Sequence, residues 1–192
     1  MPKPQPAVMD FLLTRRSRPA KTLRAPAPTR AQLQPILTAA ARTPDHGKLE
    51  PWRFVILEKA ALMRLSQLAR ERGEDLGLDD AVIAKGVAQF ADGQVAIAVI
   101  SAPKHSEKVP QIEQVLSAGA VCLAALNAAL ASGWGANWLT GWASHDREFM
   151  SRGLGLEPHE SIAGLIFLGT ETHAPPERPR PDPARIVTWM ES

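Results

Sequence analysis

The sequence predicts an α+β fold, in which a mixed sheet is covered by helices within a single domain spanning residues 1–192. Three short apolar segments rich in β-branched residues are typical of buried strands. Helical patterns separate them, but without the regular strand–helix alternation of a doubly wound fold. Hydrophobic residues make up 45% of the chain against 22% charged, so the apolar surface suffices for a core.

The first two predicted elements are helices. Residues 7–15 place apolar side chains at spacings of three and four, which puts them on one helical face. A second helix is predicted to start after Thr29, because Thr29 and Gln32 have the spacing of a capping box. It continues to Arg42. Pro35 lies inside it and should bend the helix or delay its start.

Buried strands and further helices alternate irregularly after this point. Segment 133–141, rich in glycine and tryptophan, is predicted to be a turn, because glycine commonly follows a helix C-terminus. The predicted strands are 52–57, 94–100 and 161–168, and the predicted helices are 59–72, 79–90, 111–132 and 145–152.

The C-terminal part, about residues 174–192, is predicted to be an extended arm. Residues 174–183 include five prolines, which exclude a regular helix or central strand there. An apolar segment at 186–190 follows, and its pattern fits two arrangements equally. The segment either folds back on its own domain or reaches a partner subunit.

Composition and charge exclude several classes of protein. The formal net charge is +2 and no stripe of basic and aromatic residues occurs, so nucleic-acid binding is not expected. Cys122 is the only cysteine and the five histidines lack ligand spacing, so neither an intrachain disulfide nor a metal site is expected. Apolar segment 118–130 is interrupted by Asn127 and is predicted to be a core helix rather than a membrane span. With no export signal recognised, the expected location is the cytoplasm.

Familiar catalytic motifs are absent from the sequence. It contains no GxxxxGK[ST] phosphate loop, no HExxH and no GxSxG, and Cys122 lies inside an alanine-rich helix where a packed, inert thiol is expected. We therefore predict no catalytic side chain. A bound cofactor would supply the chemistry and the protein would hold it.

Three segments offer contacts for such a cofactor. Arg15, Arg16 and Ser17 join two guanidinium forks to a hydroxyl, which suits a phosphate group, although taken alone the segment is more simply interpreted as a solvated charge run at a helix end. Segment 42–46 could merely cap a helix. The close glycines of segment 133–141 would let the backbone approach a flat ligand, while its tryptophans could equally be core or dimer contacts.

In their order along the chain, these segments resemble the FMN-dependent nitroreductase family, and in particular its small YdjA-like branch. Both begin with a helix that ends in Arg-Arg-Ser, and both have a proline loop closed by Pro-Trp-x-Phe and a Gly-x-Gly-x-x-Trp segment after the long central helix. The motifs that carry the resemblance are Arg15-Arg16-Ser17 with Arg18, Pro44-Asp45-His46, Pro51-Trp52-Arg53-Phe54, Lys108-Val109-Pro110, Glu113-Gln114, Ser117-Ala118-Gly119, and Gly133, Gly135 and Trp138.

The resemblance implies a mainly antiparallel sheet in an intertwined homodimer that exchanges C-terminal arms. It also implies an FMN site between the subunits, NAD(P)H as electron donor, and ping-pong hydride transfer to small electron-poor substrates such as nitroaromatics and quinones. A desaturase, a dehalogenase or an enone reductase would share the fold. Outside enzymes, a flavin-free module docking through its proline-rich tail is the alternative. By resemblance, the residues that contact FMN are Arg15, Arg16, Ser17, Trp138, Leu139 and Thr140 of one subunit and Arg42 and His46 of the other.

Three positions depart from the family pattern. Lys48 and Glu50 stand where many relatives have Asn and Gln, so hydrogen bonding to the flavin pyrimidine is expected to differ. Leu139 stands where the YdjA-like branch tends to have a cation. Contacts with the substrate or the phosphate are therefore expected to differ there. Lys48 or Arg42 would be the cation near the flavin N1 and O2 atoms that stabilises the reduced, anionic flavin. The sequence does not distinguish NADH from NADPH or select one substrate.

Overall fold

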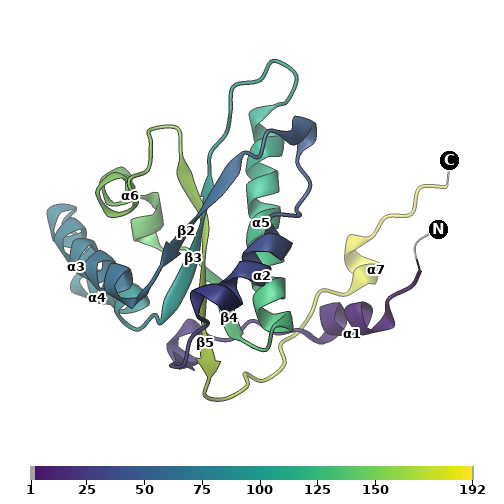
Figure 1. The fold of residues 1–192 in the computed structure, drawn as a ribbon, viewed down its shortest axis with the longest axis horizontal. Helices are drawn as coiled ribbons and strands as arrows, with labels where there is room; N and C mark the ends of the chain where they lie inside the picture. Colours follow the sequence, from purple (N-terminus) through teal and green to yellow (C-terminus); the bar gives the residue numbers. More distant parts are fainter. Residues whose placement is uncertain (1–2, 192) are drawn as a thin grey trace.

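A five-stranded sheet between two layers of helices forms the body of the computed structural model, which describes residues 3–191 (Figure 1). Within these residues the strand order is β1-β5-β3-β2, β4 also pairs with β5, and each of the four pairings is antiparallel. The α+β class and the antiparallel character are confirmed, whereas the described residues contain no parallel pairing of the kind that a mixed sheet implies. The strands are β1 (Leu23–Arg24), β2 (Trp52–Leu57), β3 (Val95–Ser101), β4 (Gly135–Leu139) and β5 (Ser161–Glu171).

The helices lie on both faces of this sheet. In Figure 1, α2 and α5 cover one face, while α3, α4 and α6 cover the other. The helices are α1 (Pro6–Thr14), α2 (Arg30–Ala40), α3 (Lys59–Asp75), α4 (Asp80–Ala91), α5 (Gln111–Ala131), α6 (Arg147–Leu154) and α7 (Pro183–Ile186), and the 3₁₀ turns are η1 (Ala20–Thr22), η2 (His46–Lys48) and η3 (Trp142–His145).

Strand β3 is the centre of the core, and all seven of its residues are buried. Successive side chains of a strand point to opposite faces, so β3 contributes side chains to a hydrophobic cluster on each face of the sheet. Ala96, Ala98 and Ile100 pack toward α3 and α6, and Val95, Ile97 and Val99 pack toward α2 and α5. Full burial of each larger side chain contributes about 1.5–3 kcal/mol, which explains why this segment shows no polar alternation.

Helix α2 begins where its cap predicts. The Thr29 hydroxyl accepts a hydrogen bond from the backbone N–H of Gln32, and the Gln32 side chain accepts one from the backbone N–H of Thr29. Pro35 lies inside the helix without delaying its start at Arg30, so of the two expected effects the delay was wrong. The capping box satisfies end groups that would otherwise lack partners.

Helix α5 is, within the described part of the chain, the one helix that is long and apolar enough to cross a membrane by length and composition. It packs instead along the sheet through one face. The buried residues of that face are Gln114, Ser117, Ala118, Val121, Cys122, Ala125, Leu126 and Ala129. The prediction of a core helix is confirmed.

Strand β4 was missed by the sequence analysis, which predicted a turn there. Gly135 pairs with Gly169 of β5 at a point where a Cβ atom would lie 2.6 Å from Leu23 and 3.1 Å from the Gly169 carbonyl oxygen. Glycine is thus needed because β1 and β5 crowd this position. The residue that suggested a turn is the one that lets the strand pair.

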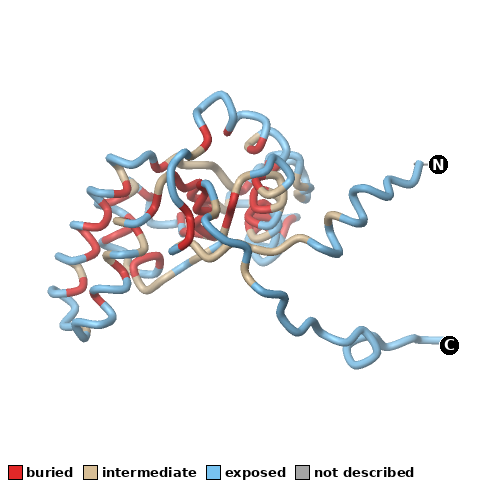
Figure 2. The backbone as a smooth tube through the Cα atoms, turned by 90° about the horizontal axis from the view of Figure 1, so that it is seen from below, coloured by how far each residue is buried: buried red, intermediate tan, exposed pale blue. Residues whose placement is uncertain are grey.

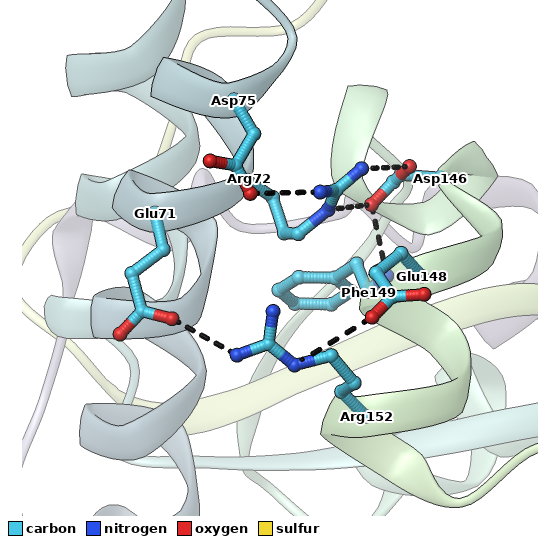
Figure 3. A network of polar contacts seen from close by, with 7 residues as sticks. All are labelled: Glu71, Arg72, Asp75, Asp146, Glu148, Phe149 and Arg152. Atoms are coloured by element: carbon cyan, nitrogen blue, oxygen red, sulfur yellow. Dashed lines mark hydrogen bonds and ion pairs between the residues drawn. The ribbon is translucent and has the colours of Figure 1, made fainter.

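A charged network joins α3 to α6 (Figure 3). Both carboxylate oxygens of Asp146 accept hydrogen bonds from the Arg72 guanidinium, at 2.8 and 3.2 Å. Asp146 also caps α6 by accepting the backbone N–H of Phe149 at 2.8 Å. The Arg72 hydrogen bond lowers the pKa of Asp146. Because Asp146 directly follows η3, this network also positions the segment that leaves β4.

A second ion pair crosses the sheet. Arg53 of β2 donates from Nε and Nη2 to the two carboxylate oxygens of Glu160, both at 2.7 Å, and Glu160 directly precedes β5. The Glu160 side chain is 7% exposed and that of Arg53 is 41% exposed. The Arg53 hydrogen bond outweighs the effect of burial and lowers the pKa of Glu160 to about 2.

Glu160→Gln should therefore lower the free energy of unfolding at pH 7, by on the order of 2 kcal/mol for a largely buried carboxylate with a partly solvated partner. A carboxyl group with a depressed folded-state pKa stabilises the protein above its unfolded pKa, and this contribution disappears as pH falls toward about 2. Urea unfolding at several pH values should show the two proteins converging between pH 5 and pH 2. A constant difference would contradict the assignment. Glu58→Gln removes an exposed partner of Arg30 and should change little.

The two ends of the described chain extend from the body on the same side (Figures 1 and 2). Helix α1 has no buried residue, and residues 176–191 are exposed throughout. Trp189 and Met190 are 85% and 84% exposed. Of the two arrangements considered for the apolar segment 186–190, packing on its own domain is therefore wrong, and the short helix α7 inside the arm was not predicted.

Candidate functional site

The segment 15–18 follows α1 and is held against β4. The backbone N–H of Arg18 donates to the carbonyl oxygen of Ala136 at 2.8 Å. The side-chain amide of Asn137 donates to the carbonyl oxygen of Arg18, also at 2.8 Å. These bonds fix the segment on the sheet edge and so determine where the arginine side chains begin.

Arginine side chains converge beside this segment. Arg15 donates from Nη2 to the Ser17 hydroxyl at 2.8 Å. Burial, followed by the positive charges of Arg180, Arg16 and Arg18, lowers the pKa of Arg15. The fold thus holds like charges close together, and their repulsion lowers the stability of the folded state. Such an arrangement is typical of a site prepared for an anion.

A cavity of about 330 Å³, called the arginine cavity below, lies between these arginines and the start of β4. The Nε atoms of Arg15 and Arg16 are buried without a hydrogen-bond partner in the described part of the chain, which is costly unless a ligand supplies acceptors. A phosphate group offers several acceptor oxygens and matches guanidinium forks. The residues present therefore fit a phosphate. The lining residues are Phe11, Thr14, Arg15, Arg16, Arg18, Leu130, Gly133, Trp134, Gly135 and Glu171.

The three residues predicted to line a flavin ring lie at the other end of β4. Trp138 is 37% exposed, and its indole Nε1 lies directly over Gly164, on the face covered by α5. Leu139 packs into the cluster formed with α3 and α6, on the opposite face. Leu139 and Thr140 line a separate cavity of about 490 Å³ that also includes Lys21 and Lys85. The structure thus does not place the side chains of Trp138 and Leu139 on one surface.

Arg42 and His46 lie elsewhere in the chain. Arg42 follows the end of α2, and the His46 ring Nδ1 lies 2.7 Å from a carboxylate oxygen of Glu113, in the first turn of α5. Leu130, near the other end of α5, lines the arginine cavity. At 1.5 Å per residue, Glu113 and Leu130 are about 25 Å apart along the helix. Within a single chain, His46 therefore lies far from the arginine cavity.

The loop after His46 has an unusual backbone. Lys48 and Glu50 have φ values of 56° and 47°, which are uncommon for residues with a Cβ atom. The Asp45 carboxylate compensates in part, because it accepts the backbone N–H groups of Leu49 and Glu50 at 2.8 and 3.3 Å. The two departures from the family pattern thus lie in a strained loop, a feature often associated with binding sites.

Sequence reasoning missed Arg180, Glu171 and Glu177 as parts of this site. Glu171 forms an ion pair with Arg18 at 2.7 Å. Arg180 and Glu177 come from the C-terminal arm, more than 150 residues after Arg16 in the sequence. The only sequence signal was the gathering of arginines at 178, 180 and 185, which does not identify the surface they contact.

Comparisons with known proteins agree on one family. The family model described as "Nitroreductase family" matches residues 12–170. YdjA of Escherichia coli (strain K12), classed as an NAD(P)H nitroreductase, is 34% identical over 95% of this chain and 98% of its own length.

Solved structures show the same fold. A nitroreductase-like family protein from Bacillus cereus superposes with a TM-score of 0.77 at 20% identity, covering 100% of both chains. A nitroreductase-class protein from Desulfovibrio desulfuricans, crystallised in complex with FMN, has a TM-score of 0.74 at 20% identity and covers 98% of both chains. From its match to the family model and its identity to YdjA, the chain belongs to the nitroreductase family of oxidoreductases.

Proposed function

We propose that this protein is an FMN-dependent NAD(P)H oxidoreductase that reduces small electron-poor compounds such as nitroaromatics and quinones. The observation that carries the proposal is that the buried Nε atoms of Arg15 and Arg16, beside the cavity at β4, have no hydrogen-bond partner among residues 3–191. Relatives support it, since one of them was crystallised with FMN and another is classed as an NAD(P)H nitroreductase. The expected location remains the cytoplasm.

Arg15 and Arg16 would bind the phosphate of FMN, and Ser17 would orient Arg15 through the bond already present between them. Trp138 would cover part of the flavin ring, while Leu139 and Thr140 would contact it through their backbone. When bound, FMN supplies the redox chemistry, taking a hydride from a nicotinamide in one half-reaction and passing electrons to the substrate in the other. The protein's part is to bind and orient the reactants.

A homodimer would complete the site. Exposed apolar side chains of α5 recur at helical spacing on its outer face, which is typical of a helix that packs against another subunit. These residues are Ile112, Val115, Leu116 and Leu123. Two such helices packed antiparallel across a two-fold axis would bring Arg42 and His46 of the second subunit toward the arginine cavity. They would thus overcome the separation of about 25 Å within one chain.

A homodimer would also provide a binding surface for the apolar segment of the C-terminal arm. An apolar groove of about 510 Å³ lies among α1, α2 and α5, and the buried Asn127 Oδ1 atom beside it has no hydrogen-bond partner among the residues that the structure describes. The exposed apolar residues 186–190 of the second subunit would fill this groove, which exchanges arms between subunits.

The test of the function is the visible absorbance spectrum of the purified protein, followed by release and identification of the chromophore. About one FMN per chain, bleached by NADH or NADPH and recoloured by a quinone or nitroaromatic, is the expected result. A colourless protein that also fails to bind added FMN would contradict the proposal. A flavin that NAD(P)H reduces but that no such acceptor reoxidises would contradict the substrate class alone.

A further inference from the structure

The C-terminal arm contacts Arg16, which lines the arginine cavity, before it leaves the body. Arg16 donates from Nη2 to the carbonyl oxygen of Pro176 at 2.8 Å, and its Nε lies 3.9 Å from a carboxylate oxygen of Glu177. The other Glu177 oxygen accepts from Arg180 Nε at 3.0 Å. Glu177 thus lies between two guanidinium groups, that of Arg16 and that of Arg180 in its own arm.

The charges of the cavity do not balance. Four guanidinium groups gather there, from Arg15, Arg16, Arg18 and Arg180. Glu171 pairs with Arg18 and Glu177 pairs with Arg180 and Arg16, whereas no carboxylate within residues 3–191 forms an ion pair with Arg15. This leaves an excess of two positive charges while Glu177 is in place and of three once Glu177 is displaced, so a phosphate monoester carrying about −1.5 to −2 at pH 7 meets a net positive site in both cases.

Glu177 contacts Arg16, one of the two arginines proposed to bind the phosphate. Its side chain is 63% exposed while that of Arg16 is 18% exposed, so Glu177 approaches the site from solvent and is not part of the packed structure. A carboxylate is a weaker match for two forks than a phosphate, because it has two oxygens rather than three to share between them.

We propose that Glu177 is a built-in counter-anion of the phosphate site, which FMN displaces on binding, and that it limits the affinity for FMN. This inference rests on the proposed function. Displacement costs the Glu177 contacts with Arg16 and Arg180, so wild-type protein binds FMN more weakly than a variant without that charge. An exposed ion pair of this kind supports an effect of about two- to fivefold in affinity.

The test compares FMN binding by flavin-free wild type, Glu177→Gln and Glu177→Ala. Both variants should bind FMN about two- to fivefold more tightly at 0.1 M salt. The advantage should vanish near 1 M salt, where the screening length falls from about 10 Å to about 3 Å. Riboflavin, which lacks the phosphate, should bind all three proteins equally. Glu74→Gln on α3 is the matched control, since it removes one exposed carboxylate from the other side of the sheet.

The outcomes separate the two proposals. Equal or weaker FMN binding by both Glu177 variants would overturn the counter-anion role, as would an equal gain for riboflavin, which would mean a general loosening of the arm. Wild type and variants that all fail to bind FMN would overturn the proposed function itself. Thermal melts of the flavin-free proteins verify folding, which an exposed side chain should not affect.

Discussion

Arg15→Ala is expected to weaken FMN binding by about 10- to 100-fold, because a hydrogen bond to a charged group contributes about 1.5–3 kcal/mol. The Arg15 guanidinium lines the cavity, and its buried Nε lacks an acceptor within the described chain. Arg16→Ala should have a similar effect. The measurement is an FMN titration of flavin-free protein, monitored by the change in flavin fluorescence.

Folding should survive the Arg15 substitution. The burial of Arg15 and the charges of Arg180, Arg16 and Arg18 oppose its protonated form, so removing it relieves repulsion. The flavin-free variant should therefore melt no lower than wild type, as expected where function is maintained at the expense of stability. Full FMN occupancy in both the Arg15 and Arg16 variants would refute the assignment.

Two further variants serve as controls: one keeps the positive charge at position 15, and the other removes an arginine that does not line the cavity. Arg15→Lys keeps the charge but loses the paired donors of a guanidinium, so it should recover only part of the affinity. Arg30→Ala breaks an exposed ion pair with Glu58 at the start of α2 and should bind FMN as wild type does.

The elements that sequence patterns predicted correctly are those encoded by neighbouring residues. The capping box at Thr29 and Gln32 located the start of α2, and the uninterrupted apolar segment of β3 identified a strand buried on both faces. Strand β4 depends on pairing with β5, about 30 residues later, and on the space that Gly135 leaves for β1. The residues near Gly135 in the sequence indicate neither the pairing with β5 nor the close approach of β1.

The arginine site divides in the same way. Arg15, Arg16 and Ser17 are adjacent in sequence, so their chemistry could be recognised as a unit. Arg180 and Glu177 join them only because β5 returns the chain to β4 and the arm then crosses segment 15–18. Contacts over such a sequence separation depend on the whole fold.

A mixed dimer should restore FMN sites that neither parent protein has. One parent carries Arg15→Ala, and the other carries Arg42→Ala with His46→Ala. If each site combines residues 15–17 of one subunit with Arg42 and His46 of the other, both sites of either homodimer are damaged. A heterodimer then has one site with every substitution and one with none. Random assortment of equal amounts would rebuild about a quarter of all sites.

The separation along α5 is what makes this prediction specific. His46 is paired with Glu113 near one end of the helix, while Arg15 lies beside Leu130 near the other, so no movement of a single side chain joins them. Differently tagged chains, co-expressed and purified through both tags, isolate the heterodimer, and its FMN content is then measured. About one FMN per heterodimer is expected, against almost none in either parent. If the heterodimer forms and stays colourless, or if the Arg42 and His46 variant alone retains full FMN, the site belongs to a single chain and the proposed arrangement is wrong.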